Sequence, residues 1–343
     1  MPEIIIALDA MGGDNSPDAM CEGAVQALEK YEDIRIRLYG PEKLLKEKLA
    51  SAPEAARARL EIVDAPEVIT MEDAPMIAVR RKKDSSMVKA AEDVRGGAAH
   101  AFVSAGSTGA VVACGMMRVG RIPGVERPAL AVAYPGKEKT FLLLDSGAIV
   151  DCRAEWIAAF GLMGAAYMHA VFGVEDPEVR LLNIGAEETK GNKVSQEAYQ
   201  LMSNQRAYRF GGNIEARDVP YGRADVVACD GFDGNIVIKL TEGLASALIS
   251  IMKSEIMGST RTKIGGLLVK PAMSKVKGML DSEQHGGAPL LGVNCAMVKA
   301  HGSSRATGIC NAIRQAAQMV RGDMVERIRA GLDVLGLHGE EKA

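Results

Sequence analysis

Short runs of apolar residues alternate with amphipathic segments along most of the chain. Runs this short are typical of buried strands, and they predict strands at Ile4–Asp9, Ile34–Tyr39, Leu60–Val63, Ala101–Ser104, Ala129–Tyr134, Phe141–Asp145, Val179–Ile184, Ala224–Cys229 and Met297–Ala300. The segments between them carry a helical period, which predicts helices at Pro17–Lys30, Ser86–Arg95, Thr108–Arg118, Arg153–Phe172 and Asn235–Met257. Residues 65–85 and 258–288 fit neither pattern, and we expect them to be irregular.

Near-continuous apolar strands that alternate with helices are typical of a parallel sheet covered by helices on both faces. We therefore predict an α/β fold, a three-layer α/β/α sandwich with a mostly parallel sheet. No internal repeat or low-complexity linker divides the chain, so we expect one domain over residues 1–343.

Polar, glycine-rich loops follow six of the expected strands. They are Ala10–Asp14, Ser104–Gly109, Asp145–Ala148, Gly185–Gly191, Asp230–Asn235 and His301–Ser304. The carboxyl ends of parallel strands meet at the edge of the sheet where α/β proteins bind ligands. We therefore expect the six loops to converge on one site.

Two of these loops have the pattern of an anion site. Glycine lets backbone N–H groups approach a ligand closely, and a helix N-terminus attracts negative charge. After Gly12-Gly13, Ser16-Pro17 reads as a helix cap followed by proline at the first helical position. After Gly106, either Ser107 or Thr108 can cap the next helix. We expect phosphate here, although neither loop has a nucleotide-binding motif.

Charged side chains near the loops are candidates for binding and for acid–base chemistry. The lysines are Lys82, Lys83, Lys190 and Lys239, and the carboxylates are Asp9, Asp14, Asp145, Asp230 and Asp233. Each carboxylate could equally cap its own loop. His301 ends a strand in front of Gly302-Ser303-Ser304, where a general acid or oxyanion donor is useful.

The composition narrows the function classes. A net charge of −3 gives no basic excess, so we expect no nucleic-acid partner. Six scattered cysteines without a CxxC pair, and five dispersed histidines, predict reduced thiols and no metal site. No G-x-S-x-G motif is present, so a covalent acyl-enzyme is not expected. Without a signal peptide or an apolar run of about 18 residues, we expect a cytoplasmic chain that does not span a membrane.

Eight blocks along the chain resemble one known family. They are Asp9–Asp14, Lys82–Met87, Ser104–Ala110, Leu144–Ala148, Gly185–Gly191, Asp230–Asn235, Gly286–Gly292 and His301–Ser304. In this order they resemble the phosphate acyltransferase family of bacterial phospholipid synthesis, the PlsX type. The chain departs from the family pattern at Ala74, Ser107, Ile149, His285 and Cys295, where Lys, Asn, Asn, Tyr and Gly are usual.

The resemblance implies a fold like those of isopropylmalate dehydrogenases and phosphotransacetylases, a homodimer and no cofactor. It implies transfer of a fatty acyl group from acyl carrier protein to inorganic phosphate. The acyl phosphate then passes to a membrane glycerol-3-phosphate acyltransferase. Arg80, Arg81 and Lys82 are candidates for docking the acidic carrier.

Loops and resemblance together give a list of predicted site residues. The predicted catalytic residues are Asp9, Lys190, Asp230 and His301. The predicted phosphate- or substrate-binding residues are Gly12, Gly13, Asp14, Lys83, Ser104, Gly106, Ser107, Thr108, Asp145, Glu187, Asn235, Lys239 and Ser303. In this hypothesis the two glycine loops hold phosphate with Lys190 or Lys239, and His301 or a nearby hydroxyl assists the leaving thiolate.

Residues 251–280 differ from the rest of the chain because methionines and aliphatic residues alternate with lysines and arginine. Such a segment suits an interfacial helix, a partner-binding helix or a dimer-forming hairpin. We predict peripheral contact with the inner face of the membrane through Leu267, Leu268 and Val269.

Three other functions fit the same pattern less well. One is a phosphotransacetylase-like enzyme that uses acyl coenzyme A. Another is a nicotinamide-dependent decarboxylating dehydrogenase, for which the chain lacks a convincing set of metal-binding aspartates and substrate arginines. The third is a non-catalytic, membrane-associated scaffold for the carrier protein, which the four predicted catalytic residues argue against.

Overall fold

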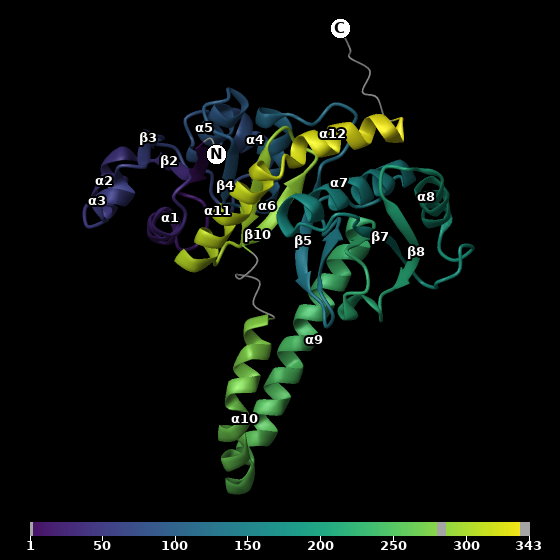
Figure 1. Ribbon diagram of the computed structural model, residues 1–343. Helices are drawn as coiled ribbons and strands as arrows, with labels where there is room; N and C mark the ends of the chain where they lie inside the picture. Colours follow the sequence, from purple (N-terminus) through teal and green to yellow (C-terminus); the bar gives the residue numbers. More distant parts are fainter. Residues whose placement is uncertain (1–2, 280–285, 337–343) are drawn as a thin grey trace.

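The computed structural model describes residues 3–279 and 286–336 and contains one eleven-stranded sheet (Figure 1). The strand order is β3-β2-β1-β4-β11-β10-β5-β6-β9-β7-β8. The strands are β1 (Ile4–Asp9), β2 (Ile34–Gly40), β3 (Leu60–Asp64), β4 (Ala101–Ser104), β5 (Ala129–Pro135), β6 (Thr140–Leu144), β7 (Glu178–Asn183), β8 (Arg209–Glu215), β9 (Val226–Ala228), β10 (Gly287–Leu291) and β11 (Ala296–Ala300).

Helices cover both faces of the sheet, which confirms the predicted three-layer α/β/α sandwich. They are α1 (Asp18–Lys30), α2 (Glu42–Lys48), α3 (Glu54–Arg57), α4 (Pro75–Arg81), α5 (Ser86–Arg95), α6 (Thr108–Cys114), the π-helical turn η1 (Gly115–Val119), α7 (Ala154–Phe172), α8 (Lys193–Asn204), the 3₁₀ turn η2 (Val219–Tyr221), α9 (Gly231–Met257), α10 (Thr260–Met279), α11 (Ala306–Arg321) and α12 (Met324–Leu335).

The expectation that residues 258–288 are irregular was wrong. Residues 258–288 are mostly helical rather than irregular, because α10 occupies Thr260–Met279, and β10 begins at Gly287. Residues 65–74 and 82–85 are irregular, as expected, and only the short helix α4 lies between them. Residues 280–285, which include His285, lie outside the described part of the chain.

The sheet changes strand direction at its centre. Strand β10 pairs antiparallel with both β11 and β5, and β5 pairs antiparallel with β6. Three successive reversals leave β6, β9, β7 and β8 running opposite to β1–β4 and β11. The expectation that all six glycine-rich loops share one edge was therefore wrong. Loops after β1, β4 and β11 leave one edge, and loops after β6, β9 and β7 leave the opposite edge.

One face of the sheet carries a single continuous core, and the other face carries two. On the continuous side, α1, α11 and α7 pack on alternate residues of nearly every strand. On the other side, residues of α5 and α6 form one core around Phe102 and Leu290. A separate core around Phe141 and Leu143 packs against the start of α9. The gap between these two cores lies over β5, and this gap positions the candidate site.

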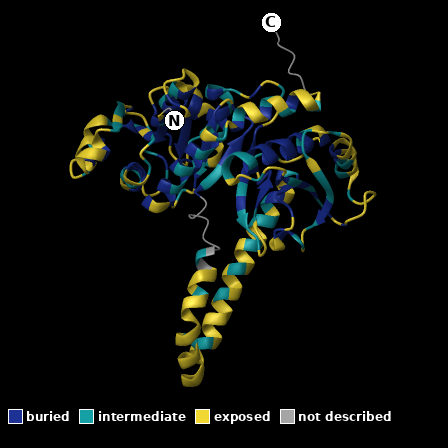
Figure 2. Cartoon of the chain, in the orientation of Figure 1, coloured by how far each residue is buried: buried dark blue, intermediate teal, exposed yellow. Residues whose placement is uncertain are grey.

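Helices α9 and α10 lie side by side and project from the body as a two-helix extension (Figures 1 and 2). Most of their residues are exposed. By length and composition alone, α9 is long and apolar enough to cross a membrane, with a mean hydropathy of 1.4 over its most apolar stretch. This apolar stretch is interrupted by two charged residues, Lys239 and Glu242.

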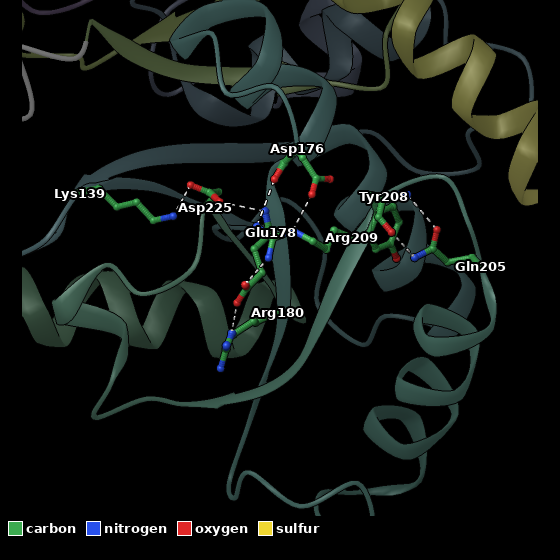
Figure 3. A network of polar contacts seen from close by, with 8 residues as sticks. All are labelled: Lys139, Asp176, Glu178, Arg180, Gln205, Tyr208, Arg209 and Asp225. Carbon is green, nitrogen blue, oxygen red and sulfur yellow. Dashed lines mark hydrogen bonds and ion pairs between the residues drawn. The ribbon is translucent and has the colours of Figure 1, made fainter.

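A polar network lies at the starts of β7, β8 and β9 (Figure 3). Asp225 is 4% exposed and accepts hydrogen bonds from the Glu178 backbone N–H and the Lys139 ammonium. The Glu178 carboxylate in turn pairs with Arg180 and Arg209. These contacts tie together the beginnings of β7, β8 and β9.

Candidate functional site

The loops after β1, β4 and β11 pack against one another, and we call them the first loop cluster (residues 9–16, 104–108 and 301–304). The Asp14 backbone N–H donates to the Gly302 carbonyl at 2.8 Å. The Asn15 amide donates to the carbonyls of Ser303 and Ser304 at 3.0 and 3.2 Å. The loops after β1 and β11, which are far apart in the sequence, are therefore hydrogen-bonded to each other.

Asp9 organises the first loop cluster from inside. Its carboxylate accepts the Ser104 hydroxyl at 2.7 Å and the Met11 backbone N–H at 3.1 Å, and Ser104 Oγ accepts the Gly106 N–H at 3.0 Å. Burial raises the pKa of the Asp9 carboxyl, and hydrogen bonds from Ser104, Ser86 and two backbone N–H groups oppose that rise. These contacts indicate a positioning role for Asp9.

The two helices that follow these glycine-rich loops, α1 and α6, begin in different ways. Ser107 caps α6 by accepting the Ala110 N–H at 3.3 Å, as predicted. The predicted Ser16 cap was wrong, because the Ser16 hydroxyl donates to the carbonyls of Met11 and Gly13 and α1 begins at Asp18. The α6 N-terminus is therefore the better-formed of the two anion sites.

His301 is exposed at the end of β11, and its ring is held by Ser303. The Ser303 backbone N–H lies 3.2 Å and its Oγ 2.8 Å from His301 Nδ1. Because a backbone N–H can only donate, Nδ1 is an acceptor, and the neutral ring carries its proton on Nε2. His301 can therefore offer an Nε2–H donor to a bound ligand.

The loops after β6 and β9 form a second loop cluster (residues 145–149 and 230–235). Asp145 is fully buried, and its carboxylate accepts four backbone N–H groups, those of Leu130, Gly147, Ala148 and Ile149. Burial raises the pKa of the Asp145 carboxyl, and these hydrogen bonds oppose the rise. The Asp145 carboxylate thus shapes its loop from within.

Asp230 and Asn235 also serve this second cluster. Asp230 caps α9 by accepting the Phe232 N–H at 2.7 Å, and its other oxygen accepts the Cys152 N–H at 2.6 Å. This cap explains why α9 begins at Gly231 and not at the predicted Asn235. Asn235 packs against Gly147, a position where a Cβ would lie 3.2 Å from the Asn235 Cβ.

The Gly185–Gly191 loop forms a separate arrangement at the end of β7. Asn183 donates to the Lys190 carbonyl at 3.1 Å, and Asn213 donates to the Glu187 carbonyl at 2.8 Å. The side chains of Glu187 and Lys190 are exposed. The structure does not bring Lys190 to the first loop cluster, because β7 and β4 end at opposite edges of the sheet.

A crevice lies over β5, beside the first loop cluster. Its floor is apolar and comes from Leu130, Val132, Ala133 and Ala288, with Ile238 of α9 on one wall. Its polar end comes from Thr108, Lys299, His301 and Ser304, with Glu242 on α9. The cavity volume is about 150 Å³, a size that holds a benzene-sized molecule.

Some predicted residues line this crevice and others do not. Thr108 and His301 do, while Lys83 and Lys239 are exposed outside the lining. Ser303 supports His301 and does not line the crevice. Sequence reasoning missed Lys299, Ser304 and Glu242. The sequence signal for Lys299 was a single lysine, two residues after Met297, in an otherwise apolar strand.

The cysteines are all buried. Burial raises the pKa of Cys21 to about 11 and of Cys152 and Cys295 to about 12, and it raises those of Cys114, Cys229 and Cys310 as well. A thiol with a raised pKa is a weak nucleophile. These cysteines are therefore poorly suited to form a covalent acyl intermediate.

Sequence comparisons place the chain among curated proteins of one kind. The profile of the family described as "Fatty acid synthesis protein" matches residues 4–327. The chain is 47% identical over 329 residues to the phosphate acyltransferase of Clostridium botulinum (strain ATCC 19397 / Type A), covering 96% of this chain and 98% of that protein. It is 45% identical over 331 residues to the phosphate acyltransferase of Alkaliphilus oremlandii (strain OhILAs), with the same coverage.

Solved structures share the fold at low sequence identity. The EutD phosphotransacetylase from Staphylococcus aureus has a TM-score of 0.63 at 16% identity, covering 93% of this chain and 94% of that one. A phosphotransacetylase from Streptococcus pyogenes has a TM-score of 0.62 with the same identity and coverage. These similarities confirm the predicted fold class.

Proposed function

The chain belongs to the fatty acid synthesis protein family, and from this membership we propose that it transfers a fatty acyl group from a carrier-protein thioester to inorganic phosphate, forming acyl phosphate. The observation that carries the proposal is the crevice over β5. Its apolar floor meets a polar end that includes the capped α6 N-terminus at Thr108. Such a site suits a ligand that is apolar at one end and reacts with an anion at the other.

The reaction needs no group on the protein to become covalently modified. A phosphate oxygen attacks the thioester carbonyl carbon, a C–O bond forms, and the C–S bond breaks to release a thiolate. The α6 N-terminus and the Thr108 hydroxyl hold phosphate, and His301 Nε2–H faces the leaving sulfur or the carbonyl oxygen. The protein mainly contributes positioning and charge stabilisation.

The acyl chain is longer than the crevice can enclose. A cavity of about 150 Å³ accommodates the reacting end and a few methylenes. The face of α9 that carries Ile238 continues at helical spacing through Thr241, Ala245 and Ile249, which are half-buried. We propose that the rest of the acyl chain follows this face.

Replacing His301 with alanine is expected to lower kcat about 10-fold while leaving carrier binding within about twofold. The effect lies below the usual range for a general acid because a thiolate leaves readily without a proton. Steady-state kinetics with separate titration of the carrier measure both quantities. Unchanged kcat would remove His301 from the mechanism.

The donor is proposed to be acyl carrier protein, and α4 supports this choice. Met76, Ile77, Arg80 and Arg81 are exposed on α4, so an apolar and basic surface faces outward. Helix α4 packs against α6 beside the crevice, where Pro75 lies close to Gly109. Lys82, the third predicted docking residue, is paired with Asp73 at 2.6 Å.

The experiment that tests this function measures thiol release with acyl carrier protein or acyl coenzyme A as donor, with and without phosphate. We expect phosphate-dependent release and a clear preference for the carrier-protein donor. A preference for acyl coenzyme A would favour the phosphotransacetylase alternative. Release without phosphate, or no release, would contradict acyl transfer to phosphate.

The α9–α10 extension is proposed to contact the cytoplasmic face of the membrane and, near its base, a second copy of the chain. Leu267 and Leu268 are 70% and 80% exposed on α10, among lysines. Apolar residues flanked by lysines suit a headgroup boundary. At the membrane, the acyl phosphate would pass directly to a glycerol-3-phosphate acyltransferase.

Introducing glutamate at Leu267 and Leu268 together is expected to weaken binding to anionic vesicles about 10-fold or more, because two apolar contacts are lost and negative charge is added. Vesicle co-sedimentation measures the effect. A matched control is Val334→Glu, since Val334 is 59% exposed on α12 of the body. Equal binding of the double variant and the control would contradict the membrane proposal.

A further inference from the structure

Lys299 is a lysine inside the crevice. It lies on β11, where Met297 and Lys299 point to the same face of the sheet and Val298 and Ala300 point to the other. The α5–α6 core contains Met297, so Lys299 lies on the crevice side, and it lines the cavity. The strand therefore fixes its Cα beside the reacting end of the crevice.

The ammonium of Lys299 lacks a direct partner. Within residues 3–279 and 286–336 it makes no hydrogen bond or ion pair, although the other lysines near the loops are exposed or, like Lys82, paired. Burial lowers the pKa of Lys299, and the carboxylate of Asp14 opposes that change from a distance. A partly buried cation of this kind is stabilised when an anion binds beside it.

Ser304 adds an independent observation at the same place. Ser304 is 3% exposed and lines the crevice, and its Oγ has no hydrogen-bond partner among the described residues. Both backbone groups of Ser304 are already hydrogen-bonded, because its N–H donates to the His301 carbonyl and its carbonyl accepts from the Asn15 amide. Buried hydroxyls are normally paired, so an unpaired one at a cavity wall calls for a ligand.

We propose that Lys299 and Ser304 form the anchoring subsite for the phosphate nucleophile, an inference that rests on the proposed function. Lys299 supplies positive charge from β11 and Ser304 supplies a hydroxyl donor from the loop after it. Thr108, the first residue of α6, lines the same crevice. Together they surround a tetrahedral oxyanion from two strand ends.

This assignment gives phosphate a cation different from those proposed from the sequence. Lys190 lies beyond the opposite edge of the sheet, and Lys239 is exposed on α9 outside the crevice lining. Lys299 is the lysine that lines the cavity.

Replacing Lys299 with methionine keeps nearly the length of the side chain and removes its charge. We expect KM for phosphate to rise about 10- to 100-fold, the range expected for a lost charge-assisted hydrogen bond, with KM for the acyl donor within about twofold. Lys299→Arg should recover part of the loss, and Ser304→Ala should raise KM for phosphate about 3- to 10-fold. The control is Lys43→Met, since Lys43 is exposed on α2.

Direct binding of inorganic phosphate, followed by titration calorimetry, separates this subsite from the proposed function. If the wild type binds phosphate and Lys299→Met does not, the subsite stands even where no acyl phosphate forms. If acyl phosphate forms but Lys299→Met and Ser304→Ala leave both KM and binding unchanged, the subsite is wrong and the function is unaffected. Should Lys299→Met fail to fold, the nearly isosteric Ser304→Ala decides the outcome.

Discussion

Replacing Asp145 with alanine is expected to lower the free energy of unfolding by about 4 kcal/mol. The Asp145 carboxylate is fully buried and accepts the N–H groups of Leu130, Gly147, Ala148 and Ile149. Each buried donor left without a partner costs about 1–3 kcal/mol. The cost of burying the charge, which raises the pKa of Asp145, offsets part of that sum.

Urea unfolding followed by circular dichroism measures this loss. Asp145→Asn keeps one acceptor oxygen and should lose roughly half as much stability, which separates hydrogen bonding from side-chain volume. Glu29→Ala is the control, because Glu29 is exposed on α1 and its loss should change stability by less than about 0.5 kcal/mol. A loss below about 1 kcal/mol for Asp145→Ala would show that the loop is not held in this way.

Replacing Gly12 with alanine is expected to reduce kcat/KM by roughly 10²–10³-fold. A Cβ at position 12 would lie 2.6 Å from the Gly106 nitrogen, 2.8 Å from Asp9 Oδ2 and 2.9 Å from Ser104 Oγ. These neighbours belong to the packed interior of the first loop cluster, so the β1 and β4 loops must move apart. A displacement of about 1 Å at a reacting centre can cost about 100-fold in rate.

Gly12→Ala should also lose about 1–3 kcal/mol of stability, as at other overpacked sites. Expressed as a free energy, the loss of kcat/KM should be larger than this loss of stability. Assays at a temperature where the variant remains folded separate the two effects. Gly265→Ala is the control, because a Cβ there meets nothing within 4 Å on α10. Near-normal activity of folded Gly12→Ala would mean that the β1 loop does not shape the site.

The sequence predicted the buried strands well, because a buried strand needs a short, continuous apolar run. Ile4–Asp9 and Ala101–Ser104 were predicted with the observed boundaries. β8 was missed because Arg209–Glu215 is polar and contains two glycines, so it has no such run. Helix α10 was missed because Pro271 and paired glycines interrupt its pattern.

The reversal of strand direction could be predicted from the lengths of the connecting loops, but not from the apolar pattern. β5 and β6 are joined by only four residues, 136–139. A parallel pair needs a crossover of about a dozen residues or more, so these two strands had to form an antiparallel hairpin. The same reasoning applies to β10 and β11, which are joined by residues 292–295.

The candidate site was predicted in outline and less well in detail. The sequence located the loops that carry Thr108 and His301, which line the crevice. It could not show that Asp9, Asp145 and Asp230 direct their oxygens at backbone and loop donors, because those contacts join residues distant in the chain. Lys299 stands out in the sequence as a lysine in an apolar strand, but it is recognised as a binding group only once the cavity beside it is known.

The central claim, acyl transfer to phosphate in this crevice, is tested most directly by supplying phosphate labelled with ¹⁸O together with acyl carrier protein thioester. Mass spectrometry of the product and a parallel thiol assay follow the reaction. We predict acyl phosphate that keeps all of the labelled oxygens, formed in equal amount to the released carrier thiol. Free fatty acid formed at the same rate without phosphate, or thiol release without labelled acyl phosphate, would contradict the account.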